Sequence, residues 1–292
     1  MCIRFLLCLI FCLSLVPTIL SEESRGYIGK LASPSGSPVP TAGPVHWSND
    51  GHLQLPELYT ECLRYSTVLV TELGVFDQVK ATRTIEQGAL IKQKGGLKQS
   101  LTSDEIERLS NFWLAHKQKT DSWQPFQAWF VAGKVSELRL VDIGFRYPGS
   151  EGFMKQLAVS QKKPIKNLYT VEDYVQFQKA IPLQEQLVSL KSSLDGDDAP
   201  FKKGVQDILD AWQCGDDSYL ITVKRSLGES DLKWINHMNG LWVEKIDGLA
   251  HKEKVVFVLV GSLHLVGNLV GNKGLIQLLL DKGFKGERLG IE

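Results

Sequence analysis

The stretch that decides the fold is residues 254–289, KVVFVLVGSLHLVGNLVGNKGLIQLLLDKGFKGERL. It begins with an unbroken apolar run at 255–260, rich in β-branched residues, which is typical of a strand buried on both faces of a sheet. A glycine ends the run and His264 follows. A helix of about ten residues, N-capped by Asn272, and a return strand at 284–289 complete the unit. The histidine therefore stands just past the end of a buried strand, where open α/β sheets place ligand sites.

A second unit of the same form lies near the start of the chain. It comprises Gly43-Pro44-Val45-His46, a polar loop, a helix that opens at Pro56 and a strand at 67–70 that Glu72 closes. Two units of glycine, two residues, histidine, loop, helix and strand predict an internal pseudo-repeat. If their strands meet in one sheet, His46 and His264 face each other across a cleft.

The middle third of the chain is predicted to be mostly helical. Apolar stripes at helical spacing and a capping box at Thr102-x-x-Glu105 predict helices over 102–119, 123–139, 171–180, 183–194, 201–212 and 231–250. Residues 78–102 are polar, contain two adjacent glycines and are interpreted as a loop. We therefore expect an α/β fold, with a central sheet built from the two G-x-x-H units and a mostly helical middle insertion.

The N-terminal end is typical of an export signal. Residues 1–21 have a basic start and an apolar core too short for a comfortable membrane span, and we interpret them as a cleaved signal peptide, with an uncleaved anchor as the alternative. Residues 22–41 are rich in glycine, proline and serine, which predicts a leader, followed by one domain over 42–292. The protein is expected to be periplasmic or secreted. Cys62 and Cys214, the only cysteines beyond the signal, are compatible with one disulfide or with two free thiols.

The charge balance limits the kind of partner. The chain has 33 basic and 33 acidic residues, which argues against nucleic acid or an anionic membrane surface as the main partner. No zinc-finger spacing, P-loop, HExxH motif or nucleophile elbow is present. A peptide or a small molecule is therefore the expected substrate, and the sequence leaves the oligomeric state open.

The residues best placed for chemistry are His46, His264 and Glu72. Neutral imidazole is a common metal ligand, and a nearby carboxylate can complete such a site or act as general base on a water molecule. The sequence thus predicts that the two histidines bind a divalent cation and that Glu72 is catalytic. The alternative is that each histidine caps a strand and bonds only to backbone.

These motifs resemble the TraB/GumN family, which also includes the TIKI-type metallopeptidases. The family pattern V-G-x-x-H-L-V-G matches residues 260–267, G-L-x-x-L-L matches 274–279 and the G-[FY] that follows it matches 283–284, and E-R-[LV] matches 287–289. The first G-x-x-H, the Leu-Pro helix start, the strand ending in Glu72 and an A-W-x-x-G-D-like segment also match, over roughly residues 42–289. The resemblance implies an exported metal-dependent hydrolase, most plausibly a peptidase, with manganese, cobalt or zinc at the histidines.

Two departures from the family pattern bear on activity. Tyr169 occupies the position of a family glutamate, and Met238 that of a family arginine. Asn239 matches the family asparagine beside that arginine. It is expected either to orient substrate or a ligand, or to belong to a solvated helix face. The resemblance therefore also leaves open a catalytically impaired binding protein of the cell envelope, or an esterase-like hydrolase.

Overall fold

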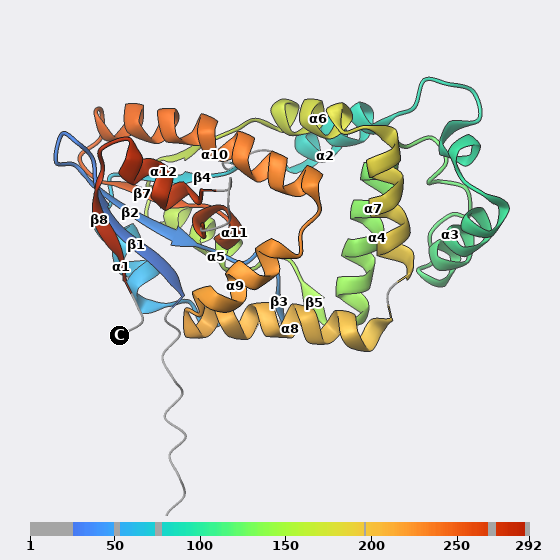
Figure 1. Cartoon of the computed structure of the whole chain (residues 1–292), viewed down its shortest axis with the longest axis horizontal. Helices are drawn as coiled ribbons and strands as arrows, with labels where there is room; N and C mark the ends of the chain where they lie inside the picture. Colours follow the sequence, from blue (N-terminus) through green and yellow to red (C-terminus); the bar gives the residue numbers. More distant parts are fainter. Residues whose placement is uncertain (1–25, 50–52, 74–77, 196, 268–272, 290–292) are drawn as a thin grey trace, which may run out of the picture.

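A mixed six-stranded sheet lies at one end of the molecule (Figure 1). The computed structural model describes residues 26–49, 53–73, 78–195, 197–267 and 273–289. The strand order is β6-β4-β7-β2-β1-β8. Strands β6, β4, β7 and β2 are parallel, and β1 runs antiparallel to both of its neighbours. The strands are β1 (Tyr27–Ala32), β2 (Pro38–Gly43), β4 (Val68–Thr71), β6 (Ile165–Asn167), β7 (Val256–Leu259) and β8 (Lys285–Leu289).

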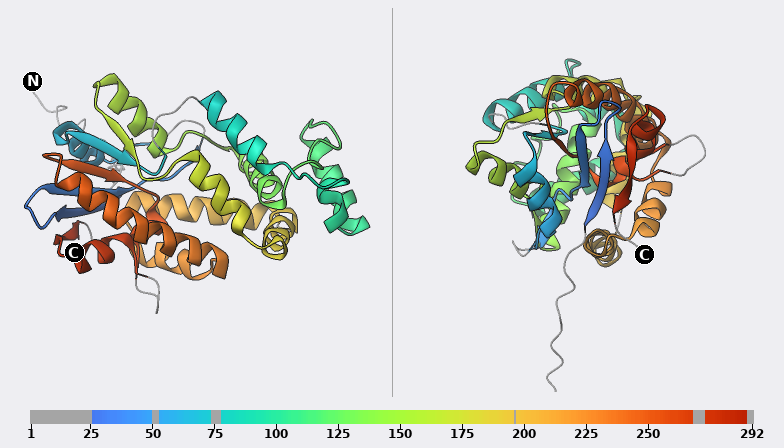
Figure 2. Two further views of the ribbon diagram at one scale, coloured as in Figure 1. Left: turned by 90° about the horizontal axis from the view of Figure 1, so that it is seen from above. Right: turned by 90° about the vertical axis from the view of Figure 1, so that its left-hand side faces the viewer.

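Helices cover the sheet and extend the molecule away from it, so that α3 lies at the end opposite the sheet (Figure 2). A short two-stranded ribbon of β3 (Ser48–Asn49) and β5 (Phe145–Arg146) lies between the six-stranded sheet and the helices that extend away from it. The helices are α1 (Glu57–Tyr65), α2 (Gln78–Ala89), α3 (Ser103–Ala115), α4 (Ala128–Asp142), α5 (Ser150–Ser160), α6 (Val171–Ala180), α7 (Leu183–Asp195), α8 (Asp198–Cys214), α9 (Asp217–Arg225), α10 (Glu229–Ala250), α11 (Ser262–Leu265) and α12 (Leu275–Asp281). This α/β architecture with a helical middle confirms the predicted fold class.

Two apolar layers enclose the sheet. Strand residues alternate between its faces, so Val68 and Val70 pack with α10 and α12 on one side while Leu69 packs with α1, α5 and α8 on the other. Trp242 and Trp212 are the fully buried anchors of the two layers. A third cluster joins α3, α4 and α7 away from the sheet. The strands that precede the histidines are therefore fixed from both faces.

The N-terminal leader prediction is wrong from Tyr27 onward. Residues 27–32 and 38–43 form β1 and β2, and β2 lies inside the sheet between β7 and β1 rather than at its edge. Prolines such as Pro38 and Pro40 are usually confined to edge strands, because proline has no N–H to donate. The structure accommodates them because β2 pairs with β7 only at Thr41 and Ala42, beyond both prolines.

Other differences from the sequence-based predictions concern individual helices. Residues 78–89 form α2 rather than a loop, and helices α5 and α9 were not anticipated. Helix α12 is capped by Gly274, and the expected cap Asn272 lies outside the described residues. The capping box of α3 at Thr102 is confirmed. Cys62 and Cys214 are free thiols.

The predicted signal peptide, residues 1–21, also lies outside the described residues. Across the part of the chain that the structure describes, none of the helices combines the length and the apolar character that a membrane crossing requires.

A buried hydrogen-bond cluster holds the start of the first G-x-x-H motif. The Tyr59 hydroxyl accepts the N–H of Tyr27 (3.0 Å) and lies 2.6 Å from the carbonyl oxygen of Gly43, to which it donates. Trp212 donates its indole N–H to the same carbonyl. Gly43 itself has to lack a side chain, because a β-carbon there would lie 2.9 Å from the Cα of Ser262. The two motifs therefore touch through backbone.

Replacing Tyr59 with phenylalanine should destabilise the protein. The change leaves the buried Tyr27 N–H without this acceptor and removes one of two donors to Gly43, so we expect a loss of about 1–3 kcal/mol in the free energy of unfolding by urea titration. Tyr65→Phe on the same helix, where the side chain is 69% exposed, is the control and should change the free energy by less than about 0.5 kcal/mol. Equal effects of both changes would contradict the role of the Tyr59 hydroxyl.

Candidate active site

Four parallel strands end side by side and carry the candidate residues. Leu259 pairs with both Ala42 and Thr71, so the residues that follow β2, β7 and β4 leave the sheet in one row. Glu72 directly follows β4, His46 lies in the loop after β2, and His264 lies on the short helix α11 after β7. Tyr169 follows β6, the next strand along. The carboxyl ends of parallel strands share one edge, which is the usual place for a ligand site in an open sheet.

The three predicted residues converge on one point beside Gly261. A β-carbon placed on Gly261 would lie 3.1 Å from Oε1 of Glu72, 3.6 Å from Nε2 of His46 and 3.8 Å from Cδ2 of His264. Gly261 therefore keeps open the space that the three side chains surround. The structure brings together the two histidines and the glutamate that the sequence singled out.

His46 is held through its other ring nitrogen. Its Nδ1 lies 2.8 Å from Oε2 of Glu151, and Lys155 bonds the second carboxylate oxygen at 2.7 Å. Burial alone would lower the pKa of His46, but the hydrogen bond and charge of Glu151 outweigh it and raise the pKa. Burial would raise the pKa of Glu151, but His46 and Lys155 together lower it to about 2. The pair leaves Nε2 of His46 facing the common point, with 40% of the side chain exposed.

His264 is buried and fixed by Asn239. The Asn239 amide nitrogen donates to the carbonyl oxygen of His264 (3.0 Å), which turns the amide oxygen toward Nδ1 of the ring (2.8 Å). Nδ1 is therefore the protonated nitrogen, and Nε2 carries the lone pair. Burial lowers the pKa of His264 to about 3, and the nearby charges of Lys224 and His46 act in the same direction. His264 is a neutral imidazole at physiological pH.

Asn239 belongs to the buried surroundings of His264. It is fully buried on α10, so the solvated-face interpretation is wrong for this residue. Its hydrogen bonds go to His264, so it orients a histidine. Its neighbour Met238 is buried in the apolar layer over the sheet.

Glu72 is bound by backbone and half-buried. Its Oε1 accepts the N–H of Gly261 at 2.7 Å. Burial raises its pKa, the charge of Glu151 adds to that, and the charge of His46 and the Gly261 N–H offset only part of the rise. A carboxylate with a raised pKa is suited to accept a proton near neutral pH.

Tyr169 closes the site on the β6 side. Its hydroxyl lies 3.5 Å from Oε2 of Glu72 and its ring stacks on Trp242 (centroids 5.9 Å apart). Trp242 in turn packs against the His264 ring at 4.4 Å. Burial and the charge of Glu72 raise the pKa of Tyr169 well above 10, so the phenol stays protonated. Tyr169 can donate a hydrogen bond but supplies no carboxylate.

The donor atoms are of types that bind divalent cations, but they are not arranged as a complete coordination shell. Nε2 of His46, a carboxylate oxygen of Glu72 and the ring of His264 surround the point beside Gly261. Each histidine is held through Nδ1, as metal-bound histidines usually are. Within the described ranges, however, no group of three or more histidine, cysteine, aspartate or glutamate side chains is arranged to hold a metal ion.

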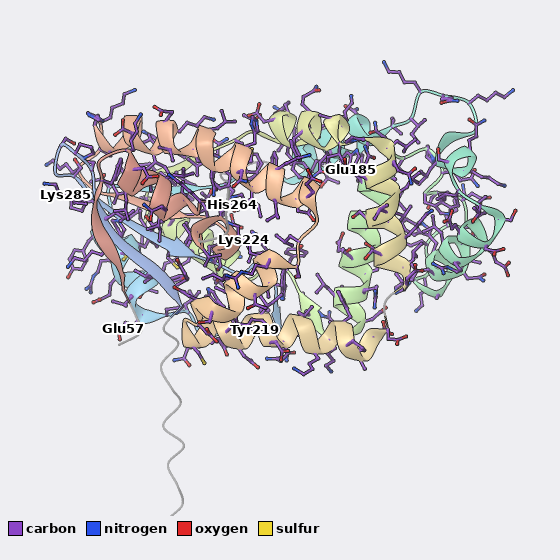
Figure 3. All side chains as sticks on the ribbon, in the orientation of Figure 1. Glu57, Glu185, Tyr219, Lys224, His264 and Lys285 are labelled. Carbon is purple, nitrogen blue, oxygen red and sulfur yellow. The ribbon has the colours of Figure 1, made fainter. Side chains whose placement is uncertain are left out.

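Sequence reasoning missed the charged residues around this site. Glu151 and Lys155 stand four apart on α5, a spacing that predicts an ion pair, but nothing in the sequence linked them to His46 over a hundred residues earlier. Lys224 on α9 is 1% exposed and donates to the carbonyl oxygen of Val266 (2.7 Å); burial lowers its pKa to about 8. It lies close to His264 in Figure 3.

The remaining histidines take no part among the described residues. His116 bonds to Asp142 (2.6 Å), His237 is exposed on α10 and His251 ends α10 at the surface. His52 lies outside the described residues.

Comparison with known proteins decides the family. The model of the TraB/PrgY/gumN family matches residues 42–288, most of the chain. The chain belongs to the TraB/PrgY/gumN family. No curated protein and no solved structure matches it. The predicted family is confirmed, and for this TraB/PrgY/gumN member the match takes in both G-x-x-H motifs and the strand that ends at Glu72.

Lowering the pH should destabilise the wild type more steeply than His264→Gln. Between pH 6.5 and about 3 the unfolded chain binds a proton at His264 that the folded chain excludes, so the contribution of His264 to stability is lost as the pH falls. One such proton is worth about 1.4 kcal/mol per pH unit. Urea titrations from pH 7 to pH 5 measure the slope. His46 is shared by both proteins, so its opposite effect cancels in the comparison. Equal slopes would contradict a buried neutral His264.

Proposed function

We propose that the protein is an exported metal-dependent hydrolase, peptidase-like, with its site at the carboxyl ends of β2, β7 and β4. The observation that carries the proposal is the convergence of His46 Nε2, Glu72 Oε1 and the His264 ring on one point beside Gly261. Family membership supports it in general terms. The apolar segment within residues 1–21 supports export to a periplasm or to the outside of the cell.

In this proposal His46 and His264 hold the cation through Nε2. A divalent ion there, manganese, cobalt or zinc, would supply a Lewis acid. Glu151 and Asn239 keep the two rings oriented, as partners of metal-bound histidines do. The exposed part of His46 gives its side chain room to close on the ion. Binding requires His46 without its proton, so affinity should rise with pH.

Glu72 is then the general base. Its raised pKa and its position beside the common point suit it to take a proton from the attacking water. The protonated Tyr169 hydroxyl faces the second oxygen of Glu72 and can donate to it or to developing negative charge on the substrate. A tyrosine where the family has a glutamate favours a second candidate, a protein that keeps the cleft for binding and lacks hydrolysis.

Metal content tests the proposal first. Purified mature protein should carry about one equivalent of metal, and His46→Ala and His264→Ala should each reduce it to background. Gly261→Ala keeps all three side chains but places a methyl group 3.1 Å from Glu72 Oε1, so it should also lose the ion. His251→Ala, at the surface end of α10, is the control and should retain it. No metal, or metal that both histidine changes leave in place, would contradict the metal site and favour the binding protein.

Glu72→Gln separates binding from catalysis. The amide keeps the shape but cannot accept a proton, so hydrolysis should fall by about 10²–10⁴-fold while metal remains bound. Initial rates on a peptide library and an ester library measure the loss and distinguish peptidase from esterase activity. Activity that survives this change would contradict Glu72 as the base.

A further inference from the structure

A cavity of about 260 Å³ lies among helices α4, α6, α7 and α10. Aromatic residues of three of these helices line it: Trp129 on α4, Tyr174 and Phe177 on α6, and Trp234 on α10. They contact one another in pairs, with Trp129 and Tyr174 edge to face at 6.0 Å and Phe177 over Trp234 at 3.7 Å. The cavity is smaller than the roughly 300–1,000 Å³ typical of sites for whole small molecules, so it suits a single side chain.

The charged groups in this cavity are acidic. Glu185, at the start of α7, and Asp231, at the start of α10, both line it, and Figure 3 labels Glu185 where these two helices meet. Among the described residues that line the cavity there is no lysine or arginine. The nearby Lys233 is paired with Glu229 at 2.8 Å.

A neighbouring cavity extends the same surface. It measures about 220 Å³, shares Trp129, Gly133 and Tyr174 with the first, and adds Glu86 and Glu137. Its one lysine, Lys134, is bonded to Glu137 at 2.7 Å. An aromatic surface with an excess of carboxylates attracts organic cations through both the ring faces and the charges.

The cavity lies one side chain away from the proposed active site. Trp234 meets the Tyr169 ring edge to face at 6.2 Å, and the Tyr169 hydroxyl lies 3.5 Å from Glu72. Tyr174 of the cavity wall and Glu151 of the site both lie close enough to Tyr169 to raise its pKa. A residue bound in the cavity would therefore leave the adjoining chain near Glu72.

We propose that this aromatic and acidic cavity is a subsite for the cationic side chain, lysine or arginine, of a peptide. Its use as a specificity subsite rests on the proposed peptidase function. The binding itself depends only on the cavity and can be measured apart from catalysis.

Gly133 gives a way to fill the cavity without disturbing the fold. It lines the cavity from α4, and a β-carbon there would meet no atom within 4 Å. Methionine at this position should occupy the space and favour the helix. A β-carbon on Gly204 of α8 would also meet no atom within 4 Å, but Gly204 lies outside both cavities. Gly204→Met is therefore the matched control.

Calorimetric titration with acetylated, amidated Ala-Ala-Lys-Ala-Ala tests the proposal, beside analogues with norleucine or glutamate in place of lysine. The lysine peptide should bind at least about tenfold more tightly than either analogue, a difference of about 1.4 kcal/mol. Gly133→Met should weaken binding of the lysine peptide at least tenfold, and Gly204→Met should leave it unchanged. Glu185→Gln combined with Asp231→Asn should remove the preference for lysine over norleucine.

Three results would overturn the subsite: equal binding of the lysine and norleucine peptides, unchanged binding in Gly133→Met, or a lysine preference that survives loss of both carboxylates. A wild type that binds the peptide in this way but hydrolyses nothing would contradict the peptidase proposal and leave the subsite intact. Hydrolysis that shows no preference for a cationic side chain would contradict the subsite and leave the peptidase proposal intact.

Discussion

The parallel pairing of β7 with β2 on one side and β4 on the other is the constraint on which the rest of the structure depends. Leu259 is level with Ala42 and Thr71, so three chain segments leave the sheet at the same height. Both faces of these strands are sealed by apolar layers, which fixes the register because a shift by one residue would turn the buried side chains to the wrong face. The meeting of the two histidines and Glu72 follows from this register.

Burial then decides which of these groups carries charge. His264 and Tyr169 are neutral because desolvation moves their pKa values away from neutrality, and Glu72 is pushed toward its neutral form for the same reason. The charge is concentrated instead on Glu151, with His46 and Lys155 beside it. The site therefore combines neutral groups inside with an ion-pair network at its more exposed rim. Such perturbed groups gathered at one edge of a sheet are typical of functional sites.

The sequence predicted the centre of this arrangement better than its surroundings. The apolar run before His264 and the two G-x-x-H motifs carry a local signal, so the fold class and the meeting of the histidines could be predicted. The inner position of β2 could not, because its prolines argue for an edge and only the pairing with β7 shows where they are tolerated. Glu151 and Lys224 reach the site through tertiary contacts between distant segments, which no spacing in the chain records.

The most direct test of the central claim is a zinc titration followed by ¹⁵N NMR of the imidazole nitrogens at pH 8. We expect the Nε2 signals of His46 and His264 to shift together and to reach completion at one equivalent of zinc, while both Nδ1 signals remain those of protonated nitrogens. A response at only one of the two histidines, or at neither, would contradict a shared site at the ends of β2 and β7.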